Sequence, residues 1–75
     1  MKFKKGDYVK IVKHYDYVYL KNQIGNIGII KEIVHNHEYP YTVLYITGEA
    51  SGSVEIYDNR GLKKLSKEEA MVELL

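Results

Sequence analysis

The chain has 75 residues, 45% of them hydrophobic, and a net charge of +1, a composition that predicts one small folded domain over residues 1–75. It has no cysteine, which excludes disulfides, thiolate metal sites and cysteine nucleophiles and favours a reducing, cytoplasmic setting. No apolar run approaches the roughly 20 residues of a membrane span, so we expect no signal peptide, anchor or membrane partner.

Short runs of β-branched and aromatic residues, separated by Gly, Asn and Asp, predict successive strands between about residues 8 and 65. In the first run, Val9 and Ile11 alternate toward the core. In the second, the apolar parity switches between Ile29 and Ile30, which predicts a bulge or bend. The expected strands cover residues 8–13, 26–35, 41–47, 53–57 and 62–65, with a long connection over 14–25 and a turn over 58–61.

The end of the sequence predicts a short helix over about residues 67–74. Ser66 followed by Glu69 fits a capping box. Ala70, Leu74 and Met71 are expected to face the sheet. Short strands with a long first connection favour a small, partly open barrel, because such a barrel leaves few exposed sheet edges.

Two segments resemble a known barrel scaffold. Residues 5–11 (K-G-D-Y-V-K-I) and 25–30 (G-N-I-G-I-I) are similar to the "G-D-x-V-x-I … G-x-x-G-x-V" opening of KOW-type and related Src-homology-3-like (SH3-like) barrels. Gly25 and Gly28 would permit a bend and a close backbone approach. The resemblance implies an all-β fold, a five-stranded SH3-like barrel with a short C-terminal helix or helical turn, a scaffold shared by many unrelated functions.

Over roughly residues 5–65, the layout also resembles the PsaE family of small photosystem I subunits. The similar segments are residues 15–17 (Y-D-Y), 24–27 (I-G-N-I) and 39–43 (Y-P-Y-T-V). In that family the barrel is a non-catalytic subunit docked on a larger complex. Residues 15–17 are also similar to part of the signature of peptide-binding SH3 domains, but the chain has no Trp and only Pro40, which argues against proline-rich ligands.

Lysines are concentrated at the two ends of the sequence, in or beside the predicted first and fifth strands. These two strands are neighbours in an SH3-like barrel. Such a face would attract nucleic acid or an acidic partner. The alternative is that edge lysines only prevent sheet-to-sheet aggregation. The net charge of +1 argues against an obligate nucleic-acid binder. The candidate face comprises Lys2, Lys4, Lys5, Lys63, Lys64 and Lys67.

The eight tyrosines suggest an aromatic binding surface. Tyr15, Tyr17 and Tyr19 alternate, so in an extended segment they project from one face. The alternative is that tyrosines cap a thin core with their hydroxyls in water. The candidate partner-binding residues are Tyr15, Tyr17, Tyr19, Tyr39 and Tyr41.

Catalytic and metal-binding motifs are absent from the sequence. His35 and His37 form a single His-x-His without the further ligands of a stable site, and no nucleophile elbow or phosphate loop is present. We therefore expect no enzyme activity, no metal and no cofactor. The sequence favours a small protein-binding module, an accessory subunit or stoichiometric inhibitor of a larger protein or complex. The alternative is a KOW-like nucleic-acid or ribosome-associated module that uses the lysine face.

Overall fold

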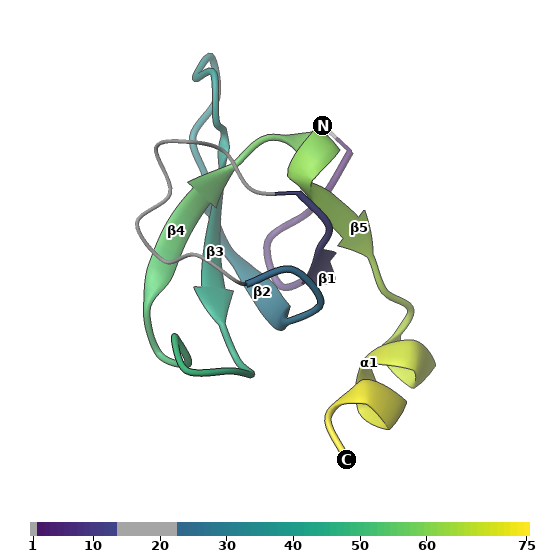
Figure 1. The fold of residues 1–75 in the computed structure, drawn as a ribbon. Helices are drawn as coiled ribbons and strands as arrows, with labels where there is room; N and C mark the ends of the chain where they lie inside the picture. The colour runs from purple at the N-terminus through teal and green to yellow at the C-terminus, as the bar shows by residue number, and fades with distance from the viewer. Residues whose placement is uncertain (1, 14–22) are drawn as a thin grey trace.

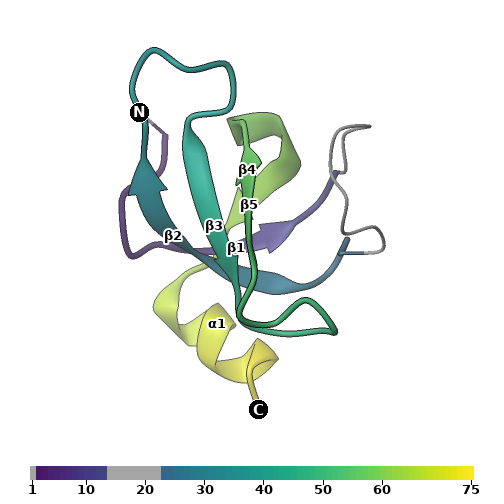
Figure 2. The same ribbon diagram turned by 90° about the vertical axis from the view of Figure 1, so that its left-hand side faces the viewer.

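The computed structural model describes residues 2–13 and 23–75, which form a curled antiparallel sheet of five strands and a short C-terminal helix (Figure 1). The sheet order is β4-β3-β2-β1-β5, and the sheet curls into a half-barrel (Figure 2). The predicted all-β class with a C-terminal helix is confirmed, and each strand lies inside its predicted range. The elements are β1 (Tyr8–Ile11), β2 (Ile27–Ile33), β3 (Tyr41–Tyr45), β4 (Val54–Tyr57), the 3-10 turn η1 (Asn59–Gly61), β5 (Leu62–Lys64) and α1 (Lys67–Glu73).

The main core lies inside the curl of the sheet. Val9 and Ile11 are fully buried there, as their alternation along β1 predicts. Burying a large apolar side chain contributes roughly 1.5–3 kcal/mol, so this cluster supplies most of the stability of so small a domain. The cluster comprises Phe3, Val9, Ile11, Ile30, Tyr41, Val43, Tyr45, Ala50, Tyr57 and Leu62.

A second, smaller cluster lies on the other side of the sheet, beneath α1. It contains Ile27, Leu65 and Ala70, with Tyr8 packed against them. Tyr8 precedes the inward-facing Val9, and successive side chains of a strand point to opposite faces. The helix therefore covers the outer surface near β1 and β5.

The predicted irregularity in β2 is present but lies slightly further along the strand. Ile30 pairs with Val43 and Glu32 pairs with Thr42, so Lys31 is the extra residue of a bulge. The expected close backbone approach occurs at Gly28. A Cβ atom there would overlap Val43 Cγ1 and lie 3.0 Å from the Leu44 carbonyl oxygen.

The described helices include none long and apolar enough to cross a bilayer, and α1 has only seven residues.

Candidate functional site

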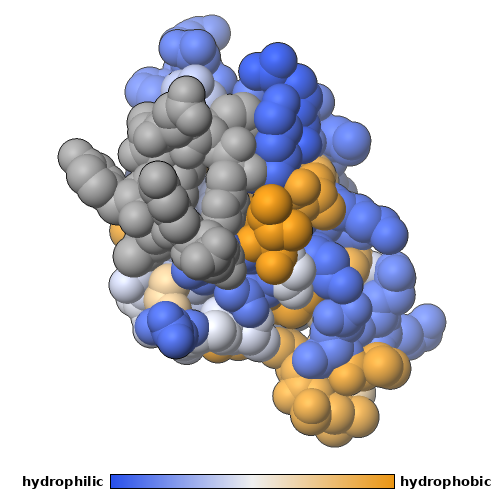
Figure 3. All heavy atoms as spheres, in the orientation of Figure 1, coloured by the Kyte–Doolittle hydropathy of each residue, from blue (hydrophilic) through white to orange (hydrophobic). Residues whose placement is uncertain are grey.

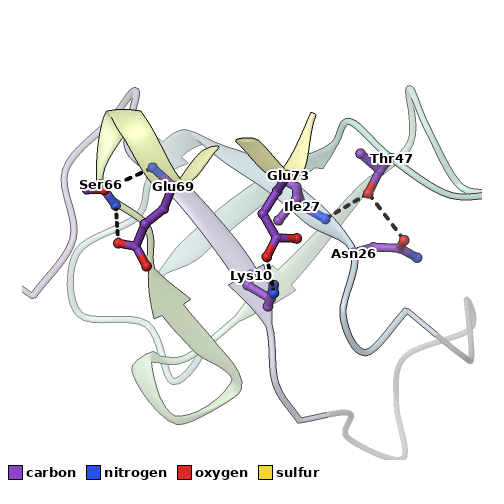
Figure 4. A network of polar contacts seen from close by, with 7 residues as sticks. All are labelled: Lys10, Asn26, Ile27, Thr47, Ser66, Glu69 and Glu73. Carbon is purple, nitrogen blue, oxygen red and sulfur yellow. Dashed lines mark hydrogen bonds and ion pairs between the residues drawn. The ribbon is translucent and has the colours of Figure 1, made fainter. Parts of the chain in front are cut away.

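Helix α1 is fixed by polar contacts at both of its ends (Figure 4). At its start, Ser66 Oγ accepts a hydrogen bond from the Glu69 N–H at 3.0 Å, and Glu69 Oε1 accepts one from the Ser66 N–H at 2.9 Å. The predicted capping box is therefore confirmed. At its end, Lys10 Nζ donates to Glu73 Oε1 at 2.6 Å, which connects the last turn of α1 to β1.

The Glu69 carboxylate is held in its charged form by this arrangement. The Ser66 N–H and hydroxyl lower the pKa of Glu69, and the positive charges of Lys63 and Lys10 lower it further. The start of the helix is thus stabilised where its unpaired N–H groups need acceptors.

Burial along α1 is opposite to that of an ordinary amphipathic surface helix. The smallest apolar side chain, Ala70, is 1% exposed, whereas Met71 is 62% exposed and Val72 is 69% exposed. Leu74 and Leu75 are exposed as well. We call the four exposed apolar residues Met71, Val72, Leu74 and Leu75 the α1 outer face.

The expectation that Ala70 faces the sheet is confirmed and that for Met71 is wrong, whereas Leu74, 39% exposed, is partly covered. Ala70 packs with Ile27, Leu65 and Tyr8, which form the surface beneath α1. Glu73, on the same side of the helix, is held by Lys10. A helix held by these contacts presents its larger apolar residues to solvent.

The α1 outer face is visible as a hydrophobic area at the C-terminal end of the molecule (Figure 3). Beside it lies a shallow hollow lined by Glu68, Glu69, Val72 and Glu73. Contiguous exposed apolar residues with a polar rim mark interaction surfaces more often than isolated ones do. The arrangement therefore offers an apolar contact surface with carboxylates at its edge.

A signal for this face is present in the sequence. Five of the last six residues, Ala70 to Leu75, are apolar, and on a helix they point in all directions. One short helix cannot bury all of them on one sheet.

Strands β1 and β5 are neighbours in the structure, as predicted. Strands β1 and β5 pair antiparallel, with Lys10 opposite Lys63 and Val9 opposite Lys64. Lys64 and Lys67 line a depression that also contains Gly6, which adjoins Lys5. All six candidate lysines, Lys2, Lys4, Lys5, Lys63, Lys64 and Lys67, are exposed.

Carboxylates offset part of this positive charge. Lys64 Nζ lies 3.7 Å from Asp7 Oδ2, and Lys10 is paired with Glu73. The charge of Lys63 also lowers the pKa of Glu69. The neighbourhood of β1 and β5 is thus of mixed charge rather than a uniform cationic surface.

The candidate tyrosines are divided by the structure. Tyr15, Tyr17 and Tyr19 lie outside the described residues. Tyr39 is half-buried, and its partial burial and the nearby Glu38 and Asp58 carboxylates raise its pKa.

Tyr41 is not a surface residue, so its assignment to the partner-binding set is wrong. It is 3% exposed, and its hydroxyl accepts hydrogen bonds from the N–H groups of Lys2 at 3.1 Å and Phe3 at 3.4 Å. Its ring packs edge-on against Phe3, with centroids 5.0 Å apart. The alternation of β3 places this side chain inward, where it closes one end of the core.

The two histidines of the His-x-His sequence lie in the turn between β2 and β3. His37 Nδ1 accepts a hydrogen bond from the Tyr39 N–H at 3.0 Å, a contact within the turn. Residues 2–13 and 23–75 contain no group of three or more His, Cys, Asp or Glu side chains placed to hold a metal ion.

These features define a small barrel-like protein of the all-β class, with a curled antiparallel sheet and a terminal helix. The NMR structure of the Bacillus subtilis protein YorP has a similar fold. The alignment has a TM-score of 0.67 and 24% sequence identity, and it covers 88% of this chain and 73% of that chain. No protein-family model and no curated protein matches the sequence. At this identity the likeness to YorP shows the fold alone.

Proposed function

We propose that the chain is a small, non-catalytic protein-binding module, an accessory subunit or stoichiometric inhibitor that docks on a larger protein through the α1 outer face. The observation that carries this proposal is the exposure of Met71 and Val72, at 62% and 69%, on a helix that buries only an alanine. Leaving such side chains in water forgoes roughly 1.5–3 kcal/mol each. A partner surface that covers them would recover that free energy.

We also propose a finer fold class and a second contact surface for the partner. We assign the half-barrel to the SH3-like class, because β5 pairs with β1 and the glycine-bearing opening motif lies at β1 and β2. Tyr15, Tyr17 and Tyr19, with the half-buried Tyr39, are proposed as further partner contacts. If replacing Tyr15, Tyr17 and Tyr19 together leaves partner binding intact in a folded protein, this part of the proposal fails.

The test is affinity capture from lysate of the source cells, with tagged wild-type protein and two variants. In the first variant, Met71→Gln and Val72→Gln remove the apolar surface but keep good helix formers at both positions. In the control, Val34→Gln changes an exposed valine just after β2. Figures 1 and 2 place the turn between β2 and β3 at the end of the molecule away from α1.

We expect wild type and the Val34 control to retain the same protein at equal levels, with or without nuclease. The Met71/Val72 variant should lose it. Equal retention by all three proteins would exclude the α1 outer face as the docking surface.

The second candidate function is a KOW-like nucleic-acid or ribosome-associated module, which the pairing of β1 with β5 favours because it places the exposed Lys63 and Lys64 beside β1. It predicts that log affinity for duplex DNA falls with log salt by about 0.9 per phosphate contact. Loss of the captured partner after nuclease treatment would support it over protein docking. Binding that does not respond to salt would exclude it.

A further inference from the structure

We infer that the partner segment covering the α1 outer face is basic and amphipathic, with apolar side chains on Met71 and Val72 and a Lys or Arg side chain beside Glu68. This inference rests on the proposed function and specifies the chemistry of the partner. It is drawn from the carboxylates that lie beside Val72 on α1.

The hollow next to the α1 outer face has three carboxylates and one apolar side chain in its lining: Glu68, Glu69, Glu73 and Val72. Two of the carboxylates already have partners, since Glu69 accepts from the Ser66 N–H and Glu73 from Lys10. The Glu68 side chain forms no hydrogen bond or ion pair within residues 2–13 and 23–75. Its carboxylate is exposed beside Val72 and can pair with a cation that the partner supplies.

Stabilisation of the helix accounts for Glu68 only in part. An acidic residue in the first turn interacts favourably with the helix dipole, worth about 0.3–1 kcal/mol, and needs no ligand to do so. That effect gives no reason for Val72 and Met71 to be exposed beside it. An apolar surface with a carboxylate rim matches a partner segment with apolar residues and a basic rim.

Two other occupants fit the charges less well. A second copy related by a two-fold axis would place the same surface on both sides of the contact, so near the axis the unpaired Glu68 carboxylates of the two copies would face each other. Like charges facing each other across an interface are destabilising. A membrane surface with anionic lipids would be repelled by the unpaired Glu68 carboxylate at the edge of the α1 outer face.

The test uses two synthetic peptides and 15N-labelled full-length protein. In the basic peptide leucines alternate with arginines, and in its acidic twin glutamate replaces every arginine. Chemical-shift changes locate each peptide on the protein, and titrations give its affinity. Three variants are compared with wild type: Glu68→Lys, the conservative Glu68→Gln, and Glu49→Lys, which makes the same charge change in the exposed loop between β3 and β4.

We expect the basic peptide to shift the amides of Glu68, Val72 and Glu73, and the acidic twin to leave them unchanged. Glu68→Lys should lower the affinity for the basic peptide by about two- to five-fold, the range for one exposed ion pair. Glu68→Gln should weaken it less, and Glu49→Lys should have no effect.

Any of four results overturns the inference: no binding, binding of the basic peptide elsewhere, equal binding of the acidic twin at α1, or equal effects of the Glu68 and Glu49 replacements. If such a result accompanies loss of the captured protein by the Met71/Val72 variant, the docking proposal stands and only the partner chemistry is wrong. If the variant keeps the captured protein, the docking proposal itself fails.

Discussion

Gly28 is the residue at which the sheet has no room for a side chain. A Cβ atom there would overlap Val43 Cγ1 on β3. We expect Gly28→Ala to lower the free energy of unfolding by about 1–3 kcal/mol, the usual cost of overpacking a core. Urea denaturation of wild type and Gly28→Ala measures this difference in the free energy of unfolding.

Replacing Val43 with alanine removes the atom that the new methyl group would meet. The double variant Gly28→Ala/Val43→Ala should therefore lose less stability than the sum of the two single variants. Strictly additive losses would show that contact with Val43 is not the reason for glycine at this position.

A buried hydroxyl pair in the core makes the protein sensitive to alkaline pH. Tyr45 and Tyr57 share a hydrogen bond of 2.6 Å between their hydroxyls. Burial raises the pKa of Tyr45 above its ordinary value of 10.0, and the charge of Glu55 raises it further, although the Tyr57 hydrogen bond lowers it. As pH rises, the unfolded chain loses this proton first, so the stabilisation is complete below about pH 10 and is lost as pH rises through the folded pKa.

We expect the free energy of unfolding of wild type to fall with alkaline pH more steeply than that of Tyr45→Phe. Chemical denaturation at several pH values on each side of pH 10 compares the two slopes, with the remaining tyrosines as a shared background. Parallel curves would contradict the effect of burial on Tyr45.

At the scale of elements, the capping box decides whether α1 stays folded. Ser66→Ala removes the acceptor of the Glu69 N–H, a change that costs about 1 kcal/mol. Because α1 is seven residues long and buries only Ala70, we expect this loss to open the helix locally. Amide exchange at Leu74, whose N–H bonds to the Ala70 carbonyl, should speed up about five-fold.

The control for this measurement is Ser53→Ala, just before β4. Ser53 is exposed, and its hydroxyl has no hydrogen bond within the described residues. Exchange at Val43, in the centre of the core, should not change in either variant. Unchanged exchange at Leu74 in Ser66→Ala would mean that contacts other than the capping box hold the helix.

The elements themselves could be predicted from local patterns in the sequence. Alternation along β1, the turn at residues 58–61 and the pairing of Ser66 with Glu69 each depend on neighbouring residues, and each is present in the structure. The bulge lies one residue further along β2 than predicted, because the pattern of apolar residues shows only that the strand changes the face it buries. Its exact position depends on how β2 pairs with β3.

The candidate site was harder to predict because it depends on contacts between distant segments. Tyr39 and Tyr41 lie on either side of Pro40 in the sequence, yet only Tyr41 is in the core. Strand β3 begins at Tyr41 and turns its side chain inward. The side of α1 that meets the sheet depends on Tyr8, Ile27 and Leu65, which come from separate parts of the chain. Spacing within the helix cannot show this.

In the molecule as a whole, the large apolar side chains of α1 contact solvent, and the barrel is packed without them. The proposed docking through the α1 outer face and the proposed chemistry of the partner segment both follow from this exposure. Clusters on both sides of the sheet are complete without Met71 and Val72. The fold should therefore tolerate their replacement, and any effect should appear in binding.

The measurement that tests this claim most directly is the free energy of unfolding of the Met71→Gln/Val72→Gln variant by urea denaturation, beside wild type and Val34→Gln. We expect the three free energies of unfolding to agree within about 0.5 kcal/mol, as those of exposed substitutions do. A loss of several kcal/mol in the Met71/Val72 variant alone would contradict it, because these side chains would then be packed against the barrel.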